Sequence, residues 1–296
     1  MNSAINIFIH AIHYSLVALL WLLDLLHIRG WVSGFLKTVT RLIVRGLFHL
    51  LYGLDVEGAE NIRTGQAFIL ACNHQSYLDP LLIGSLAPRN VTPVSKIENF
   101  HTPILGPLIE LAGAEPIDRA GGHKTLDVFE KILSSGGQII IYPEGTIPGE
   151  ESIGRTCIER DTGLLQGRTG AVRLALATGT AIIPCGISGT GDALPPEAIP
   201  RGKMPMFRLR KKIKVRFGSP IFYNPRAGEA ATRDELRKLT DRLMKEISGL
   251  VDFSMSYPPY RVPVSDEDYK NLRKFEGRAE FGRTQAEISG EECSEK

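Results

Sequence analysis

The sequence has few cysteines and almost no net charge, and both shortages exclude functions. Its four cysteines form no Cys-x-x-Cys pair, so neither a disulfide framework nor a zinc knuckle is expected. The 35 Lys and Arg residues nearly balance 33 Asp and Glu residues, giving a net charge of +2, which argues against a general nucleic-acid binder. No internal repeat is present. The 296 residues, 43% of them hydrophobic, are typical of a globular chain with one large domain or two small ones.

The composition changes along the chain and divides it into three zones. Residues 1–54 are very apolar and contain four Lys or Arg residues and one acid. Residues 55–262 are mixed in composition. Residues 263–296 are polar and poor in aliphatic side chains. We therefore expect an N-terminal membrane-anchoring segment, a folded body and a polar C-terminal tail.

The N-terminal zone predicts two helices with a break at Gly30. Ile5 to Ile28 is 24 residues long, enough to cross a bilayer core, which needs roughly 20. Its polar residues share one helical stripe, which favours a helix lying in the membrane interface or packed against a partner within the membrane. Whether this segment spans the membrane or lies in it stays open, and a soluble helical hairpin packed on the body is the alternative.

The second helical segment, Trp31 to Leu54, has a basic stripe opposite an apolar one. Lys37, Arg41, Arg45 and His49 are spaced by four residues. Such a helix can insert its apolar side while its cations reach anionic headgroups. The basic residues lie on the body's side of the first segment, which predicts a body on the cytoplasmic face of a membrane, the inner membrane in a bacterium.

From Asp55 onward, short strand-like runs alternate with helical patterns, which predicts an α/β fold. The predicted strands are Ala67–Cys72, Gln138–Tyr142, Ala181–Pro184 and Ile213–Phe217, and the predicted helices are Leu81–Ala87, Lys124–Leu133 and Gly170–Thr178. The aperiodic, acidic segment Ile147–Gln166 is interpreted as a surface loop or lid.

Three polar groups of the body could carry chemistry. His74 and Asp79 lie five residues apart just after a strand, so the carboxylate can hold one ring nitrogen and make His74 a general base. Tyr142-Pro-Glu144-Gly145-Thr146 also follows a strand, and the glycine lets backbone amides approach an anion. Arg119 could grip a phosphate. Taken singly, each also has a structural interpretation: a local pair, a tight turn, or a surface ion pair with Asp118.

Taken in order, these groups resemble the sequence blocks of the glycerolipid acyltransferase family. Asn73 to Pro80 is similar to its His-x4-Asp block, Gly113 to Arg119 to its Ile-Asp-Arg block, and Tyr142 to Thr146 to its Phe-Pro-Glu-Gly-Thr block. A fourth, proline-centred strand block is similar to Ala181–Pro184. The resemblance covers roughly residues 54–222.

The resemblance implies a mixed sheet flanked by helices, of the glycerol-3-phosphate acyltransferase type, in an acyltransferase domain over residues 55–262. It implies transfer of a fatty acyl group from acyl-CoA or acyl-carrier protein to the sn-2 hydroxyl of lysophosphatidate, giving phosphatidate. His74 would be the general base and Asp79 its orienting partner. Substrate would be bound by Arg119, Glu144, Gly145, Thr146 and Lys96. No metal or other cofactor is implied, and the expected partners are membrane lipids and the acyl donor. Nothing in the sequence specifies an oligomeric state.

The chain departs from the family where the acceptor would bind. The family usually places Arg after Pro-Glu-Gly-Thr, and here the residue is Ile147. Arg155 or Arg168 could supply the missing charge. Two alternatives therefore stay open: an O-acyltransferase of the same fold acting on another lyso-lipid, and a catalytically silent lipid-binding protein. The basic run Arg208–Arg216 is interpreted either as a solvated strand face or as a contact with anionic lipid or CoA phosphates.

Overall fold

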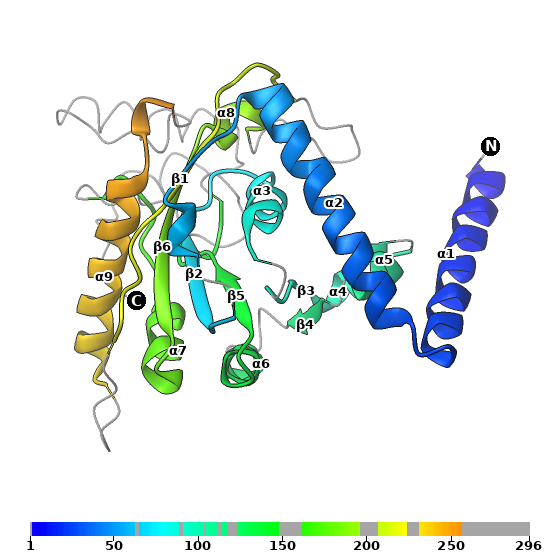
Figure 1. The fold of residues 1–296 in the computed structure, drawn as a ribbon, viewed down its shortest axis with the longest axis horizontal. Helices are drawn as coiled ribbons and strands as arrows, with labels where there is room; N and C mark the ends of the chain where they lie inside the picture. The colour runs from blue at the N-terminus through cyan, green and yellow to red at the C-terminus, as the bar shows by residue number, and fades with distance from the viewer. Residues whose placement is uncertain are drawn as a thin grey trace, which may run out of the picture.

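The computed structural model describes residues 2–62, 65–88, 91–103, 105–111, 114–117, 123–147, 162–195, 207–223 and 231–255. The chain begins with two long helices, α1 (Asn2–Leu25) and α2 (Arg29–Tyr52), which form a hairpin beside the body (Figure 1). The expected break at Gly30 is wrong, because Gly30 lies inside α2. The turn is made instead at His27, whose φ of 55° is left-handed.

The hairpin presents apolar side chains to its surroundings. On α2, Trp31, Phe35 and Leu42 are exposed, whereas Phe48 and Tyr52, near its C-terminal end, are buried against the body. Within the described residues, no helix has the length and hydropathy that crossing a bilayer requires. The expected basic stripe is divided: Lys37 and Arg41 are half-buried on the body side, while Arg45 and His49 are exposed. Burial lowers the pKa of the Lys37 amine.

The body is built on a five-stranded mixed sheet in the order β1-β7-β6-β2-β5. All neighbouring strands are parallel except β6 and β7, which are antiparallel. The strands are β1 (Asp55–Glu57), β2 (Phe68–Cys72), β5 (Gln138–Ile141), β6 (Ala181–Ser188) and β7 (Lys214–Phe217). A separate parallel pair, β3 (Val94–Lys96) and β4 (Glu115–Ile117), lies beside the short helices α4 (Ile97–Phe100) and α5 (Leu105–Leu111).

Alternation along β2 supplies both faces of the sheet with core residues. Ile69 and Ala71 pack with α6 (His123–Ser134), α7 (Gly170–Thr178) and α9 (Arg233–Leu250) on one face. Phe68, Leu70 and Cys72 pack on the other face with α2, α3 (Asp79–Leu86) and α8 (Thr190–Ala193). Short 3-10 turns complete the described chain at Ala59–Asn61 and Phe253–Met255. The predicted α/β fold with a mixed sheet flanked by helices is confirmed.

The C-terminal end of α2 belongs to the core of the body. Phe48 and Tyr52 join Leu54 in the cluster under the sheet, and Arg29 at the other end of α2 bonds Glu110 of α5 at 3.0 Å. The anchoring segment predicted over residues 1–54 is therefore tied to the body at both ends of α2. The polar tail predicted over residues 263–296 lies outside the described residues.

Candidate active site

The loop that contains His74 begins at the end of β2, the strand that lies between β6 and β5 in the sheet. Asn73 continues the pairing of β2 with β6 through its side chain: Nδ2 donates to the carbonyl of Ile187 at 3.0 Å, and Oδ1 accepts from its amide at 2.7 Å. Because Asn73 is fully buried, this pair fixes the point at which the chain leaves the sheet. The loop 73–78 then carries the chain into α3.

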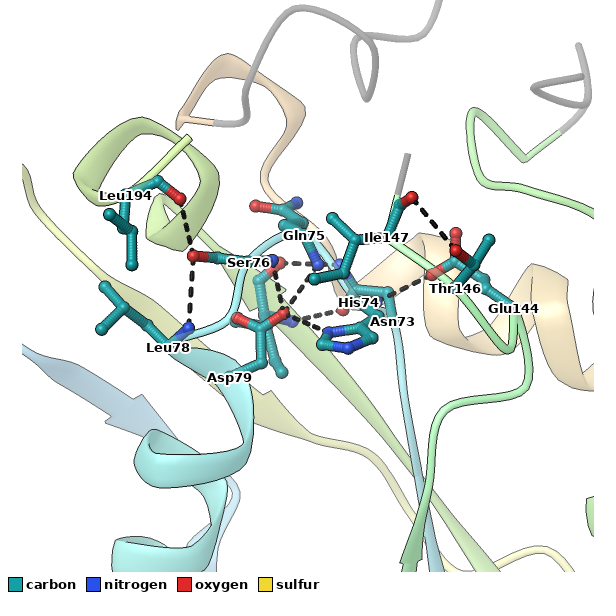
Figure 2. A network of polar contacts seen from close by, with 11 residues as sticks. Asn73, His74, Gln75, Ser76, Leu78, Asp79, Glu144, Thr146, Ile147 and Leu194 are labelled. Carbon is teal, nitrogen blue, oxygen red and sulfur yellow. Dashed lines mark hydrogen bonds and ion pairs between the residues drawn. The ribbon is translucent and has the colours of Figure 1, made fainter. Parts of the chain in front are cut away.

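His74 and Asp79 meet across this loop, as the spacing predicts (Figure 2). Nδ1 of His74 lies 2.8 Å from Oδ2 of Asp79, and the same oxygen accepts from the backbone amides of Gln75 at 2.7 Å and Ser76 at 2.9 Å. The Asp79 side chain is fully buried, and that of His74 is 14% exposed. An ionised carboxylate only accepts hydrogen bonds, so Nδ1 carries the proton and Nε2 keeps its lone pair.

Tyr142 packs on the histidine ring. The two ring centroids are 4.2 Å apart with an interplanar angle of 24°. Burial raises the pKa of the Tyr142 hydroxyl well above its ordinary value, with further contributions from the neighbouring thiols and carboxylate. Tyr142 therefore stays neutral and acts as a flat wall that limits rotation of the imidazole.

The carboxylate of Glu144 joins this wall to the histidine loop. Oε1 accepts from the backbone amide of His74 at 2.8 Å, and Oε2 accepts from the amide of Leu165 at 3.0 Å. Glu144 is fully buried. Both of these contacts are with the main chain, so Glu144 helps to fix the backbone of His74 in place.

The glycine after Glu144 adopts a conformation that favours glycine, with φ of 73°. A Cβ at Gly145 would lie 2.7 Å from Nε of Arg168, so the guanidinium side chain rests directly on this turn. The backbone amide of Arg168 donates to the carbonyl of Pro143 at 2.7 Å, which anchors the contact. Arg168 is exposed, whereas Thr146 and Ile147 are buried.

The structure brings together only part of the predicted substrate-binding set. Glu144, Gly145 and Thr146 lie beside His74. Lys96 is the last residue of β3, and its backbone pairs in register with that of Ile117 of β4. Arg119 follows β4 by two positions and lies outside the described residues, as do residues 148–161 of the predicted lid. Among the described residues, no cluster of His, Cys, Asp or Glu is placed to hold a metal ion.

A nearby thiol is unsuited to nucleophilic catalysis. Cys72 precedes the histidine loop by one residue and lies beside Cys185 of β6. Both are free and fully buried, and burial raises the pKa of the Cys72 thiol well above its ordinary value. Because the thiolate is the reactive form, Cys72 is a packing residue.

Comparisons with known proteins show which family this part of the chain is similar to. Residues 53–188 match the model of the family described as Acyltransferase. The match spans somewhat less than half of the chain. The match contains the histidine loop, the Glu144 turn and strands β1, β2, β5 and β6, and the resemblance seen in the sequence motifs is confirmed.

Curated relatives with 1-acyl-sn-glycerol-3-phosphate acyltransferase in their names are similar over part of this chain. The chloroplast protein of Arabidopsis thaliana is 28% identical over 148 residues, covering 49% of this chain and 38% of that protein. The Saccharomyces cerevisiae protein is 28% identical over 200 residues and 59% of its length. The Bacillus subtilis protein is 23% identical over 67% of this chain and 88% of its own length.

A solved structure shares the fold. The crystal structure of the 1-acyl-sn-glycerophosphate acyltransferase PlsC from Thermotoga maritima matches with a TM-score of 0.54 and 19% identity. The match covers 84% of this chain and 97% of that chain.

The support that Glu144 gives to the histidine loop can be tested by Glu144→Gln. The amide has one acceptor oxygen where the carboxylate has two, so one of the two backbone amides loses its partner inside the core. We expect the free energy of unfolding to fall by about 1–3 kcal/mol, measured by urea denaturation. Glu130→Gln, on the exposed side of α6, is the matched control. Equal stability of the two variants would contradict the role given to Glu144.

Proposed function

We propose that the protein transfers a fatty acyl group from a thioester donor, acyl-CoA or acyl-carrier protein, to the sn-2 hydroxyl of lysophosphatidate, giving phosphatidate. The observation that carries this proposal is the contact of Nδ1 of His74 with the buried Asp79 at the end of β2. It is supported by the family match and by the acceptor in the names of the relatives.

His74 acts as a general base on a hydroxyl that belongs to the substrate. Nε2 takes the hydroxyl proton while the oxygen attacks the thioester carbonyl carbon. The tetrahedral intermediate then collapses, the carbon–sulfur bond breaks, and the proton on Nε2 passes to the departing thiolate. Asp79 stabilises the imidazolium between these two transfers and keeps the ring in its tautomer. The buried Cys72 is not needed as a nucleophile.

The acceptor's phosphate would meet a different cation from the one usual in the family. Ile147 takes the position of the family's Arg and is buried, with 2% exposure. Arg168 is exposed and rests on Gly145 beside it. We assign phosphate binding to Arg168, together with Lys96, the last residue of β3, and Arg119, which follows β4 by two positions in the sequence. The buried Ile147 also favours the second candidate, an acyltransferase acting on another lyso-lipid.

The hairpin of α1 and α2 would hold the site at a membrane. The exposed apolar residues of α2 lie on the face turned away from the body, and Trp31 stacks on Phe35 with centroids 6.1 Å apart. An apolar helical face of this kind suits insertion into the interfacial layer of a bilayer, where both acyl substrates reside. We place the catalytic domain on the cytoplasmic side.

Replacement of the general base tests the reaction. His74→Ala is expected to lower kcat with lysophosphatidate and acyl-CoA by about 10²–10⁴-fold, the usual contribution of general-base catalysis. His101→Ala, which removes an exposed histidine from the turn after α4, is the control and is expected to retain activity. The purified, membrane-reconstituted full chain is assayed with labelled donor. Full activity of His74→Ala, with its circular dichroism spectrum unchanged, would support the catalytically silent alternative.

Removal of the cation at the Gly145 turn tests the acceptor. Arg168→Ala is expected to raise KM for lysophosphatidate by about 10–100-fold, because a charge-assisted contact is lost, with a smaller change in kcat. Arg168→Lys is expected to restore part of the loss. Monoacylglycerol has no phosphate, so its KM is expected to be unchanged by Arg168→Ala. Arg173→Ala, an exposed arginine on α7, is the charge control. An equal KM change for both acceptors would exclude phosphate binding by Arg168.

A further inference from the structure

A turn between α8 and β7 exposes a cluster of cations and apolar side chains. We call residues 207–212, Phe-Arg-Leu-Arg-Lys-Lys, the basic turn. All six residues are exposed, with Phe207 at 50% and Leu209 at 56%, whereas the next residue, Ile213, is fully buried. The burial of Ile213 anchors the end of the turn in the core.

Backbone hydrogen bonds tie the basic turn to the last residues of α2. The amide of Arg210 donates to the carbonyl of Leu51 at 3.1 Å, and the amide of Ile213 donates to that of Tyr52 at 3.2 Å. Figure 1 shows this segment, in yellow-green, beside the C-terminal end of α2 and next to α8. Arg210 has φ of 63°, a left-handed conformation that costs a non-glycine residue free energy. The turn is thus built at this place on the molecule by specific contacts.

The cations of the basic turn differ from those of the strand that follows. On β7, Lys214 pairs with Glu57 at 2.6 Å and Arg216 pairs with the same carboxylate at 3.0 Å. In the part of the chain that the structure describes, none of the four cations of the turn pairs with a carboxylate. Exposed cations that pair with no carboxylate among the described residues suit an anionic partner.

The basic turn continues the exposed apolar surface of α2. Leu47 and Leu50, in the last two turns of that helix, are 48% and 81% exposed. Phe207 and Leu209 add apolar side chains at the same end of the helix. Apolar side chains interspersed with cations are the pattern that binds the interface of an anionic bilayer.

We propose that the basic turn is a second membrane contact, which binds the anionic headgroups of a bilayer while Phe207 and Leu209 enter its interfacial layer. The inference rests on the membrane location given under the proposed function. Phosphates of an acyl donor would account for the four cations, but they would leave the exposed phenylalanine and leucine without a partner. A bilayer accounts for both.

This contact would set the position of the catalytic loop relative to lipid. The amide of Arg208 donates to the carbonyl of Ala193 at 2.7 Å, and the carbonyl of the next residue, Leu194, accepts from Oγ of Ser76 at 2.7 Å. Ser76 lies two residues after His74. Two short contacts at the C-terminal end of α8 therefore connect the basic turn with the loop that contains His74.

The experiment measures partitioning of the full chain onto vesicles by co-sedimentation. Vesicles of phosphatidylcholine alone are compared with vesicles that also contain phosphatidylglycerol. The double variant Lys211→Gln/Lys212→Gln is expected to bind anionic vesicles more weakly by roughly fivefold per charge, the equivalent of about 1 kcal/mol each, and neutral vesicles unchanged. Phe207→Ser/Leu209→Ser is expected to weaken binding to both. The charge-matched control is Arg233→Gln/Lys238→Gln on α9, which lies on the side of the body away from α1 (Figure 1).

Three outcomes would overturn the proposal. The first is unchanged vesicle binding by both basic-turn variants. The second is a loss of anionic-vesicle binding by Lys211→Gln/Lys212→Gln that only equals the loss by the α9 control. The third is unchanged vesicle binding together with a raised KM for acyl-CoA on a short-chain acceptor in free solution, which would assign the cations to the donor. Failure of the proposed acyl transfer would be seen separately, as a wild-type chain that binds vesicles but acylates no acceptor.

Discussion

Oδ2 of the buried Asp79 carboxylate accepts hydrogen bonds from the His74 ring and from the two backbone amides that follow it. A fully buried carboxylate is costly unless its hydrogen bonds compensate for lost water, and here three donors converge on a single oxygen. Asp79 is also the first residue of α3, where the partial positive charge of the helix end favours an anion. The same interaction therefore folds the loop, begins a helix and orients the imidazole.

The position of this loop depends on the sheet. Strand β2 is flanked by β6 and β5, and residues from both neighbours hold the segment that follows it: Ile187 of β6 binds Asn73, and Glu144, three residues beyond β5, binds His74. His74 is thus held from the sides of both neighbouring strands, while the C-terminal end of α2 packs with α3 in the core. Helix α2, which exposes apolar side chains on one side, is in this way part of the scaffold that positions the histidine loop.

The strands and helices expected in the body, and the pairing of His74 with Asp79, could be predicted from the sequence. The four expected strands and three expected helices are all present, and the five-residue spacing of His74 and Asp79 gives the contact expected of it. The resemblance led to Glu144 as a substrate-lining residue, but its burial and its main-chain bonds depend on Leu165, which only the folded chain brings near. The insertion of β7 between β1 and β6, parallel to the first and antiparallel to the second, likewise depends on contacts far apart in sequence.

Three other features differ in how far the sequence indicates them: the helix α9, the turn of the hairpin and the contact of Arg168 with Gly145. The helix α9 begins with a capping box formed by Thr232 and Glu235, and its buried residues recur at helical spacing within a strongly charged segment. The turn of the hairpin falls at His27, which has no glycine to mark it, and Gly30 fits within α2 because a helix tolerates glycine at a modest cost. The contact of Arg168 with Gly145 has no sequence pattern, since 22 positions separate them and their approach is tertiary.

The central claim is that Asp79 holds the proton of neutral His74 on Nδ1, so that Nε2 can accept one from an alcohol. The most direct measurement is the ¹⁵N chemical shift of both ring nitrogens in histidine-labelled protein, with His74 assigned by comparison with His74→Ala, at a pH where the ring is neutral. The account predicts a protonated Nδ1 and an unprotonated Nε2, and a mixture of tautomers in Asp79→Asn. A proton found on Nε2 in the wild-type chain would contradict it.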